Sequence, residues 1–169
     1  MLPEELKSLQ APLKQRYRDE PAAALITLKA SGVLGAESMS CRVDTGKALV
    51  EAGLHPATGG TGLQACSGDM LLEALAACAG VTLGAVATSL GIMVRGGMVN
   101  VEGDLDFRGT LGVSKEAPVG FEGIRVTFVL DTDATEEEIA TLLKLTERYC
   151  VVAQSLRVRP TFSITLKPG

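Results

Sequence analysis

One long uncharged stretch constrains the fold of this chain more than any other feature. Residues 69–90 read DMLLEALAACAGVTLGAVATSL, and the chain carries no charge from 74 to 94. Most of these residues are tolerated in a helix, and Gly91 can end one, with Ser67 or Asp69 near its N-cap. The pattern predicts a single long helix over these residues. Because this helix is apolar all round, we expect protein to cover it on every side.

The length of this helix raises the alternative of a membrane span, since about twenty apolar residues cross a bilayer. The stretch is rich in Ala, Gly, Thr and Ser, and no aromatic residue stands at either end, so we expect a protein core and no membrane. Ala76, Gly80, Gly84 and Thr88 form a smooth stripe where another element can approach closely. One small domain can hardly cover such a helix, and we predict an obligate homodimer with the helix at its interface.

Size and charge exclude several classes of function. A chain of 169 residues folds as one domain, or as two small lobes that share a core. The net charge is −4 and no basic run is present, so nucleic acid is not an expected partner. The first residues, MLPEELKSLQ, lack a basic segment followed by an apolar one. We therefore expect no signal peptide and a cytoplasmic protein.

The chain is interpreted as a short arm followed by one main domain. Residues 1–21 form an N-terminal helical arm, in which a helix over 3–18 carries an apolar stripe and begins with a proline and two acidic residues. Pro12 stands inside this helix and is expected to kink or divide it. Residues 22–169 form the main domain.

Alternation of apolar and polar residues predicts an α+β main domain with a mainly antiparallel sheet. A capping box, Thr135-x-x-Glu138, starts a helix that runs towards Tyr149, and a short helical turn is predicted over 150–156. The predicted strands cover residues 24–30, 39–43, 99–107, 124–130 and 162–166.

A glycine-rich loop, GLHPATGGTGLQACSG, precedes the central helix at residues 53–68. It matches neither G-x-x-x-x-G-K-[ST] nor G-x-G-x-x-G, which excludes these nucleotide-binding motifs. We expect it to be a plain connection or one wall of a pocket. It holds the single histidine of the chain, His55, for which a solvated or capping role and a catalytic role both stay open.

The four cysteines are widely scattered, and no pair has C-x-x-C spacing. We therefore expect no metal and no cofactor, and cysteines that are mostly thiols in the cytosol. Cys41 is predicted to be a small core residue on a strand. Cys66 is predicted to be a small loop residue, with a thiol inside a pocket as the alternative.

The segment GDMLLEALAACAG, followed some seventy residues later by LTERYCVVAQSL, resembles the OsmC/Ohr family of osmotically inducible and organic hydroperoxide resistance proteins. EGDLDFRGTLG is similar to the strand that follows the central helix in that family. The resemblance implies an intertwined homodimer with two long central helices. It also implies an oxidative-stress peroxidase that reduces organic hydroperoxides and is regenerated by an external dithiol. Cys78 then corresponds to the peroxidatic cysteine and Cys150 to the resolving one.

The implied reaction has a clear physical requirement. A thiolate attacks the O–O bond and becomes a sulfenic acid, and a second thiol condenses with it to a disulfide. Cys78 should therefore have a lowered pKa, through a neighbouring cation or a helix dipole. Cys150, if it opens a short helix, would also lie where the dipole favours a thiolate. The alternative for both residues is a buried, inert cysteine.

The chain departs from the family pattern around the expected catalytic arginine. Gly68 stands where the peroxidases have a glutamate that holds this arginine, and the adjacent Asp69 is the predicted substitute. Arg42 is the predicted arginine, with Arg16 and Arg18 as alternatives that can also come from the partner chain. Val151 replaces the proline that usually follows the second cysteine. These differences indicate an OsmC-like branch, and they keep open a second function, in which a non-enzymatic dimer binds a small apolar or acyl ligand.

Overall fold

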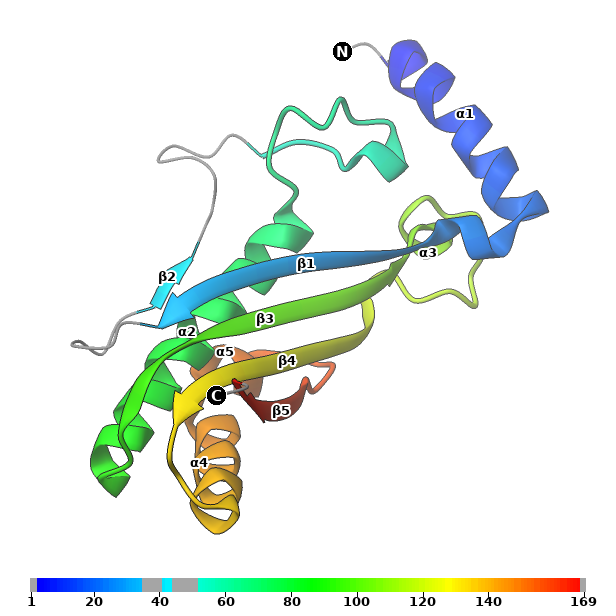
Figure 1. The fold of residues 1–169 in the computed structure, drawn as a ribbon. Coiled ribbons are helices and arrows are strands. Elements are labelled where there is room, and N and C mark those ends of the chain that lie inside the picture. Colours follow the sequence, from blue (N-terminus) through cyan, green and yellow to red (C-terminus); the bar gives the residue numbers. More distant parts are fainter. Residues whose placement is uncertain (1–2, 35–40, 44–51, 168–169) are drawn as a thin grey trace.

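A five-stranded sheet forms the frame of the computed structural model, which describes residues 3–34, 41–43 and 52–167. The strand order is β2-β1-β3-β4-β5, and neighbouring strands are antiparallel except for the parallel pair β4–β5 (Figure 1). The predicted α+β fold with a mainly antiparallel sheet is therefore confirmed. The strands are β1 (Leu25–Leu34), β2 (Cys41–Val43), β3 (Val94–Asp106), β4 (Phe121–Thr132) and β5 (Thr161–Leu166).

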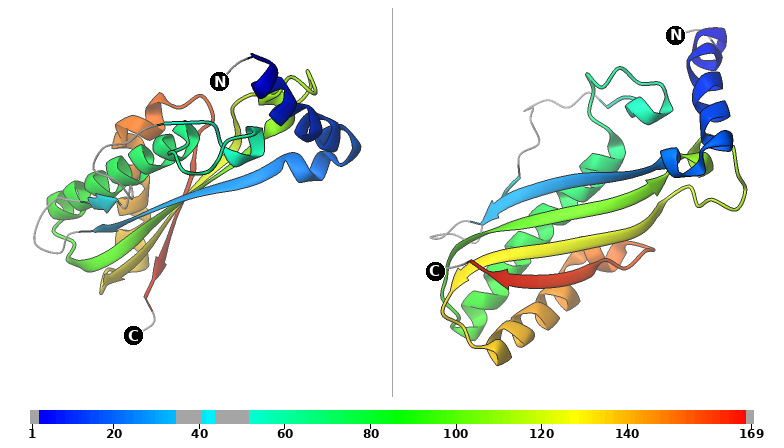
Figure 2. Two further views of the ribbon diagram at one scale, coloured as in Figure 1. Left: turned by 90° about the horizontal axis from the view of Figure 1, so that it is seen from above. Right: turned by 45° about the vertical axis from the view of Figure 1, so that its right-hand side comes forward.

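Three helices cover one face of this sheet: α2 (Ser67–Leu90), α4 (Glu136–Tyr149) and α5 (Val151–Ser155) (Figure 2). α2 packs against β1 and β3, and α4 packs against α2 and β5. The core lies between the helices and the sheet, where each fully buried aliphatic side chain contributes about 1.5 to 3 kcal/mol. Its largest members with no exposed surface are Leu72, Leu75, Leu83, Val99, Val101, Val126, Phe128, Leu130 and Leu142.

The other face of the sheet is polar. Lys29 on β1 pairs with Glu102 on β3, and Arg125 on β4 bonds both Glu102 and Asp104. The Thr27 hydroxyl donates a hydrogen bond of 2.8 Å to Asp104. These pairs hold the pKa of Glu102 and of Asp104 below the ordinary value, chiefly through Lys29 and Arg125 respectively. Solvent screens such exposed pairs, so this face contributes little to stability.

The predicted central helix is confirmed, with one correction at its start. α2 begins at Ser67, and its N-cap is Cys66 instead of Ser67 or Asp69. It ends as predicted at Gly91, which adopts the left-handed conformation (φ 71°) and donates its N–H to carbonyls of the last turn. Glycine is the residue that this conformation favours.

The single chain does not cover this helix on every side, so full coverage stays a prediction that depends on the partner of the predicted dimer. Met70, Leu71 and Val81, which lie on one side of α2, are 37 to 40% exposed, because the sheet and α4 cover only the other side. We call this exposed apolar surface the open side of α2. By length and hydropathy alone α2 could also cross a bilayer, but a core helix packed on a sheet meets the same criterion.

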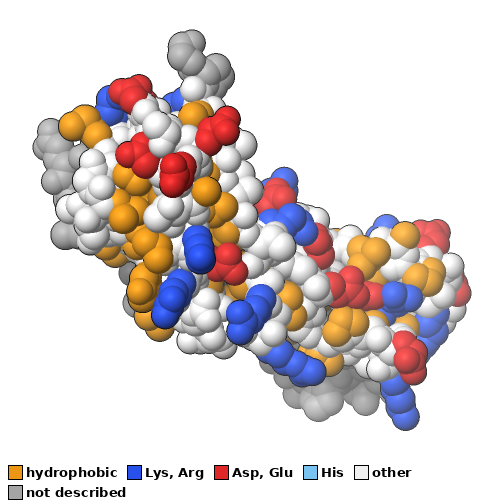
Figure 3. Space-filling model, turned by 90° about the horizontal axis from the view of Figure 1, so that it is seen from below, with side chains coloured by type: hydrophobic (Ala, Val, Ile, Leu, Met, Phe, Trp, Pro, Cys, Tyr) orange, Lys and Arg blue, Asp and Glu red, His pale blue; other side chains and the backbone are white. Residues whose placement is uncertain are grey.

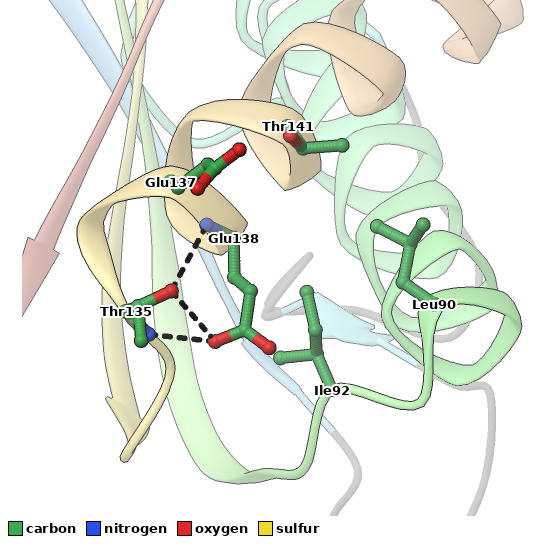
Figure 4. Close-up of a pocket in the computed structure, with 6 residues that line it drawn as sticks. All are labelled: Leu90, Ile92, Thr135, Glu137, Glu138 and Thr141. Atoms are coloured by element: carbon green, nitrogen blue, oxygen red, sulfur yellow. Dashed lines mark hydrogen bonds between the residues drawn. The ribbon is translucent and has the colours of Figure 1, made fainter.

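The predicted capping box at the start of α4 is confirmed (Figure 4). The Glu138 N–H donates to the Thr135 hydroxyl at 3.3 Å, and the Thr135 N–H donates to the Glu138 carboxylate at 2.7 Å. This second bond holds the pKa of Glu138 below its ordinary value. A surface hollow of about 370 Å³ lies beside it, between Ile92 and Thr141.

The N-terminal helix α1 (Pro3–Asp19) packs on one end of the main body (Figure 1). Pro12 lies inside it, and the helix continues across this proline, so the alternative of a divided helix is wrong. Tyr17 is buried, and its hydroxyl donates a hydrogen bond of 2.8 Å to the carbonyl oxygen of Ala57. The boundary between residues 1–21 and 22–169 stays a prediction.

Several predicted strand boundaries need correction, and β1, β3 and β4 are longer than predicted. Ala24 belongs to a 3-10 turn, η1 (Pro21–Ala24), so β1 begins one residue later. β3 ends at Asp106, and Phe107 starts a short helix, α3 (Phe107–Thr110). The Asp106 carboxylate accepts the Arg108 N–H at 2.9 Å, and this cap turns the chain out of the strand.

Two other predictions reach residues that the structure does not describe. Of the strand predicted over 39–43, only β2 is described, and the remainder lies outside the described residues. The side chains of Cys41 and Arg42 also lie outside what is described.

Candidate functional site

The fold brings Cys78 and Cys150 together, although they are 72 positions apart in the sequence. Cys78 lies in the middle of α2, and Cys150 lies at the junction of α4 and α5. α5 packs against α2, and the Cys78 thiol is within hydrogen-bonding reach of the Cys150 thiol. Cys150 has no exposed surface, whereas Cys78 is half-buried. The two residues form a thiol pair with one accessible member.

Hydrogen bonds on both sides fix the position of Cys150. Its N–H donates to the Thr146 carbonyl at 3.0 Å, and its own carbonyl accepts the Gln154 N–H at 2.9 Å. It therefore ends α4 and caps α5 at once, as the predicted turn over 150–156 requires. Val151 takes the first position of α5, where proline is favoured but not required, so the helix forms without it.

Burial raises the pKa of the Cys150 thiol to about 11, and the neighbouring Cys78 thiol acts in the same direction. The N–H groups of Ala153 and Val152, at the start of α5, act in the opposite direction and are outweighed. The start of α5 thus favours a thiolate at Cys150, as expected, but burial has the larger effect and the net pKa is raised. Near neutral pH this residue is a thiol, which suits a second reactant better than a first one.

Cys78 does not lie at a helix terminus. It follows Ser67, the first residue of α2, by eleven positions, and the effect of a helix dipole falls off within the first turn. Ala74 and Val81, one turn to either side, are exposed, so Cys78 borders the open side of α2. The dipole of α2 therefore does not reach this thiol, and activation by a neighbouring cation stays a prediction.

Arg42 is placed near α2 only by its backbone. β2 packs against α2, and Arg42 is paired with Val33 of β1. The role of its side chain stays a prediction. Arg16 and Arg18 are exposed on α1, and the Arg18 guanidinium donates to the Gln15 side chain. These two arginines therefore stay alternatives, as donors to another chain.

Asp69 and Cys78 are not brought together within one chain. They are nine residues apart on α2, which corresponds to about 180° around the helix and about 13 Å along it. Burial raises the pKa of Asp69, while His55 lowers it in part. The nearby charge partner of Asp69 is thus His55, and a role of Asp69 at Cys78 stays a prediction that requires a second chain.

The loop before α2 forms one wall of a pocket, which was one of the two expectations for it. This cavity, of about 410 Å³, lies at the N-terminus of α2, and we call it the N-terminal cavity. His55 caps the turn η2 (Pro56–Thr58), because its Nδ1 accepts the Ala57 N–H at 3.0 Å. The capping role predicted for His55 is confirmed. The lining is Gly53, Leu54, His55, Thr58, Cys66, Ser67, Gly68, Leu71, Leu105, Phe107, Thr110, Val119, Gly120 and Phe121.

Some residues of these sites were missed by reasoning from the sequence. The ring of Phe107 stacks on His55 with centroids 4.9 Å apart, although Phe107 was assigned to a strand. Thr146, one helical turn before Cys150, is fully buried. The sequence could have indicated this burial, because the i, i+4 spacing of Leu142, Thr146 and Cys150 places all three on one face of a helix. Within the described ranges, no group of three or more His, Cys, Asp or Glu side chains is arranged to hold a metal ion.

Charge is mixed on the surface near α4 and β5. In the view of Figure 3, acidic side chains gather at one end of the surface, and several basic side chains lie in a row across its middle with hydrophobic and polar atoms between them.

Comparison with known proteins places this fold. The crystal structure of an OsmC-like protein from Mycoplasma pneumoniae superimposes with a TM-score of 0.59 at 17% identity, covering 85% of this chain and 96% of that one. The organic hydroperoxide resistance protein OhrB of Bacillus subtilis matches with a TM-score of 0.47 at 21% identity, covering 82% and 97%. No curated protein sequence matches the chain. The family model of OsmC-like proteins matches residues 60–165, more than half of the sequence, and the chain therefore belongs to the OsmC-like family.

Proposed function

We propose that this protein is a thiol-dependent peroxidase that reduces organic hydroperoxides through Cys78, with Cys150 as the resolving residue. The observation that carries the proposal is the thiol pair, in which a half-buried Cys78 lies within hydrogen-bonding reach of a fully buried Cys150 from a distant part of the sequence. Membership of the OsmC-like family supports the same reading.

The reaction balances with the two thiols alone. The Cys78 thiolate attacks the terminal oxygen of the hydroperoxide, the O–O bond breaks, and the alkoxide leaves as an alcohol after it takes a proton. The sulfenic acid on Cys78 is then attacked by the Cys150 sulfur. The S–S bond forms, the S–OH bond breaks, and hydroxide leaves as water with the thiol proton. An external dithiol reduces the disulfide and restores both thiols.

An apolar groove next to the thiol pair supports an organic substrate. The groove has a volume of about 410 Å³, runs between α2 and α4, and begins one helical turn after Cys78, at Val81 and Thr82. Tyr149, which precedes Cys150, lines its other side. An alkyl or aryl tail gains free energy by leaving water in such a groove, and hydrogen peroxide has no tail to bind. We infer that organic hydroperoxides are preferred.

The groove and the open side of α2 also support the proposed homodimer. Met70, Leu71 and Val81 are exposed on one side of α2, and a second copy related by a two-fold axis would bury them. Asp69 lies on the opposite side of α2 from Cys78, so its role at Cys78, like that of Arg42, stays a prediction that this dimer does not explain. The protein is proposed to act in the cytoplasm.

The decisive experiment is to oxidise the reduced protein with one equivalent of cumene hydroperoxide. The reaction is quenched with an alkylating agent after seconds, and the cysteines are mapped by mass spectrometry. We expect a Cys78–Cys150 disulfide, in wild type and in the control Cys66→Ser. Four free thiols after minutes, or a Cys78→Ser protein that consumes hydroperoxide at the wild-type rate, would reject the proposal.

A second candidate function is the binding of a small acyl ligand without catalysis. The N-terminal cavity favours it, because its walls include Leu54, Leu71 and Phe121, and Gly68 leaves space where a glutamate would stand. Decanoate is a suitable probe. If this function is correct, decanoate protects Cys66 from iodoacetamide and leaves the alkylation of Cys78 unchanged. Equal protection of both thiols, or of neither, argues against it.

A further inference from the structure

Among the residues that the structure describes, one buried hydroxyl group has no hydrogen-bond partner. Thr146 lies on α4 without exposed surface, and its Oγ1 makes no hydrogen bond to any residue that the structure describes. A threonine inside a helix commonly bonds the carbonyl one turn earlier, and Thr146 does not. Leaving a buried donor unpaired is unfavourable, so each such group calls for an explanation.

The position of this hydroxyl points to the thiol pair. Thr146 and Cys150 are four residues apart on the same helix face, and the Cys150 N–H donates to the Thr146 carbonyl at 3.0 Å. Side chains on a helix lean towards its N-terminus, so the Cys150 side chain leans over the turn that holds Thr146. Both residues are fully buried. The unpaired hydroxyl therefore lies one helical turn from Cys150 in the same buried part of the protein, and it makes no bond to the Cys150 sulfur in this state.

The chemistry of Cys150 favours a further donor in this space, in addition to the N–H groups of Ala153 and Val152, which lower its pKa but are outweighed by burial. To attack an oxidised Cys78, the Cys150 thiol must lose its proton and carry a negative charge away from water, which is costly without a hydrogen-bond donor. Among the described titratable groups on α2, α4 and α5, Cys78 alone acts on the ionisation of Cys150. The charged groups Asp69, Glu73, Glu147 and Arg148 on these elements do not contribute to it.

We propose that the Thr146 hydroxyl donates a hydrogen bond to the Cys150 sulfur when this thiol ionises to attack oxidised Cys78. The inference rests on the proposed function, because it gives Thr146 a part in the resolving step. The hydroxyl neither gains nor loses a proton. It stabilises the charge on sulfur until the S–S bond forms, and the Cys150 proton leaves with the departing group or to solvent.

The test isolates the resolving step from any reaction with peroxide. In a background with Cys41→Ala and Cys66→Ala, Cys78 is converted by Ellman's reagent to a mixed disulfide with thionitrobenzoate. The Cys150 thiolate then attacks the Cys78 sulfur, the protein disulfide forms, and coloured thionitrobenzoate leaves as the thiolate. Its release rate is followed by stopped flow for wild type, Thr146→Val, Thr146→Ala and Thr146→Ser.

We expect Thr146→Val and Thr146→Ala to slow this release by about tenfold or more, the usual effect of a lost hydrogen bond to a charged group. Thr146→Ser keeps the hydroxyl and should release at close to the wild-type rate. Unchanged release in the two variants without a hydroxyl overturns the inference, as does equal slowing in Thr146→Ser or a wild type that never closes the disulfide. If closure succeeds here while cumene hydroperoxide gives no disulfide, the proposed function fails and the role of Thr146 stands.

Discussion

The Gln154 side chain donates a hydrogen bond of 2.9 Å to the carbonyl oxygen of Glu147, across the turn that holds Cys150. This bond ties α5 to the last turn of α4. We expect Gln154→Leu to lower the free energy of unfolding by about 1 kcal/mol. It should also slow the closure of the Cys78–Cys150 disulfide while the alkylation of Cys78 is unchanged. Gln15→Leu, which removes an exposed bond on α1, is the matched control and should leave closure unaffected.

Because Cys150 is buried, the free energy of unfolding should depend on pH in the alkaline range. The folded state raises the pKa of this thiol to about 11, so the neutral form is favoured by folding. The resulting stabilisation is fully present below the unfolded pKa of roughly 8.5 and is lost as the pH rises through about 11. We expect the wild type to lose roughly 2 to 3 kcal/mol more than Cys150→Ala between pH 8 and 11. Urea denaturation at several pH values measures this difference, and parallel losses would show that Cys150 ionises freely in the folded protein.

The helix ends that the sequence predicted correctly are set by short-range patterns of residues. Gly91 ends α2, and Thr135 with Glu138 starts α4, through bonds between residues that are close in the chain. The turn at Cys150 follows from the same kind of short-range pattern. Such elements can be read from spacing alone, because tertiary packing does not alter which backbone groups need a cap.

Tertiary packing explains what the sequence could not predict. The open side of α2 depends on which elements fold over it, and the raised pKa of Cys150 depends on burial that no motif encodes. The separation of Asp69 from Cys78 could have been predicted from the sequence, because two side chains nine residues apart in a helix lie on opposite sides of it. Phe107 was misassigned because alternation continued past the cap at Asp106.

Asp106 anchors the wall of the N-terminal cavity. Its buried carboxylate accepts the backbone N–H of Arg108 and pairs with the Arg108 guanidinium, and α3 begins between them at Phe107. We expect Asp106→Ala to cost about 3 kcal/mol, because a cap and the buried member of an ion pair are lost together. The change should also disrupt the stacking of the Phe107 ring on His55 and weaken the binding of any ligand in this cavity. Asp131→Ala removes a partner of Arg95 on the surface and should have a much smaller effect in the same denaturation experiment.

A single charged substitution on the open side of α2 tests the oligomeric state. Val81 is 40% exposed in the single chain, lies on this side, and lines the groove beside Cys78. If a second copy covers it, Val81→Glu buries an unpaired carboxylate at the interface and should convert a dimer to a monomer in sedimentation experiments. Leu166→Glu, on the exposed edge strand β5, is the control that should keep the wild-type mass. A wild type that sediments as a monomer would remove the shared site, and Asp69 could then have no role at Cys78.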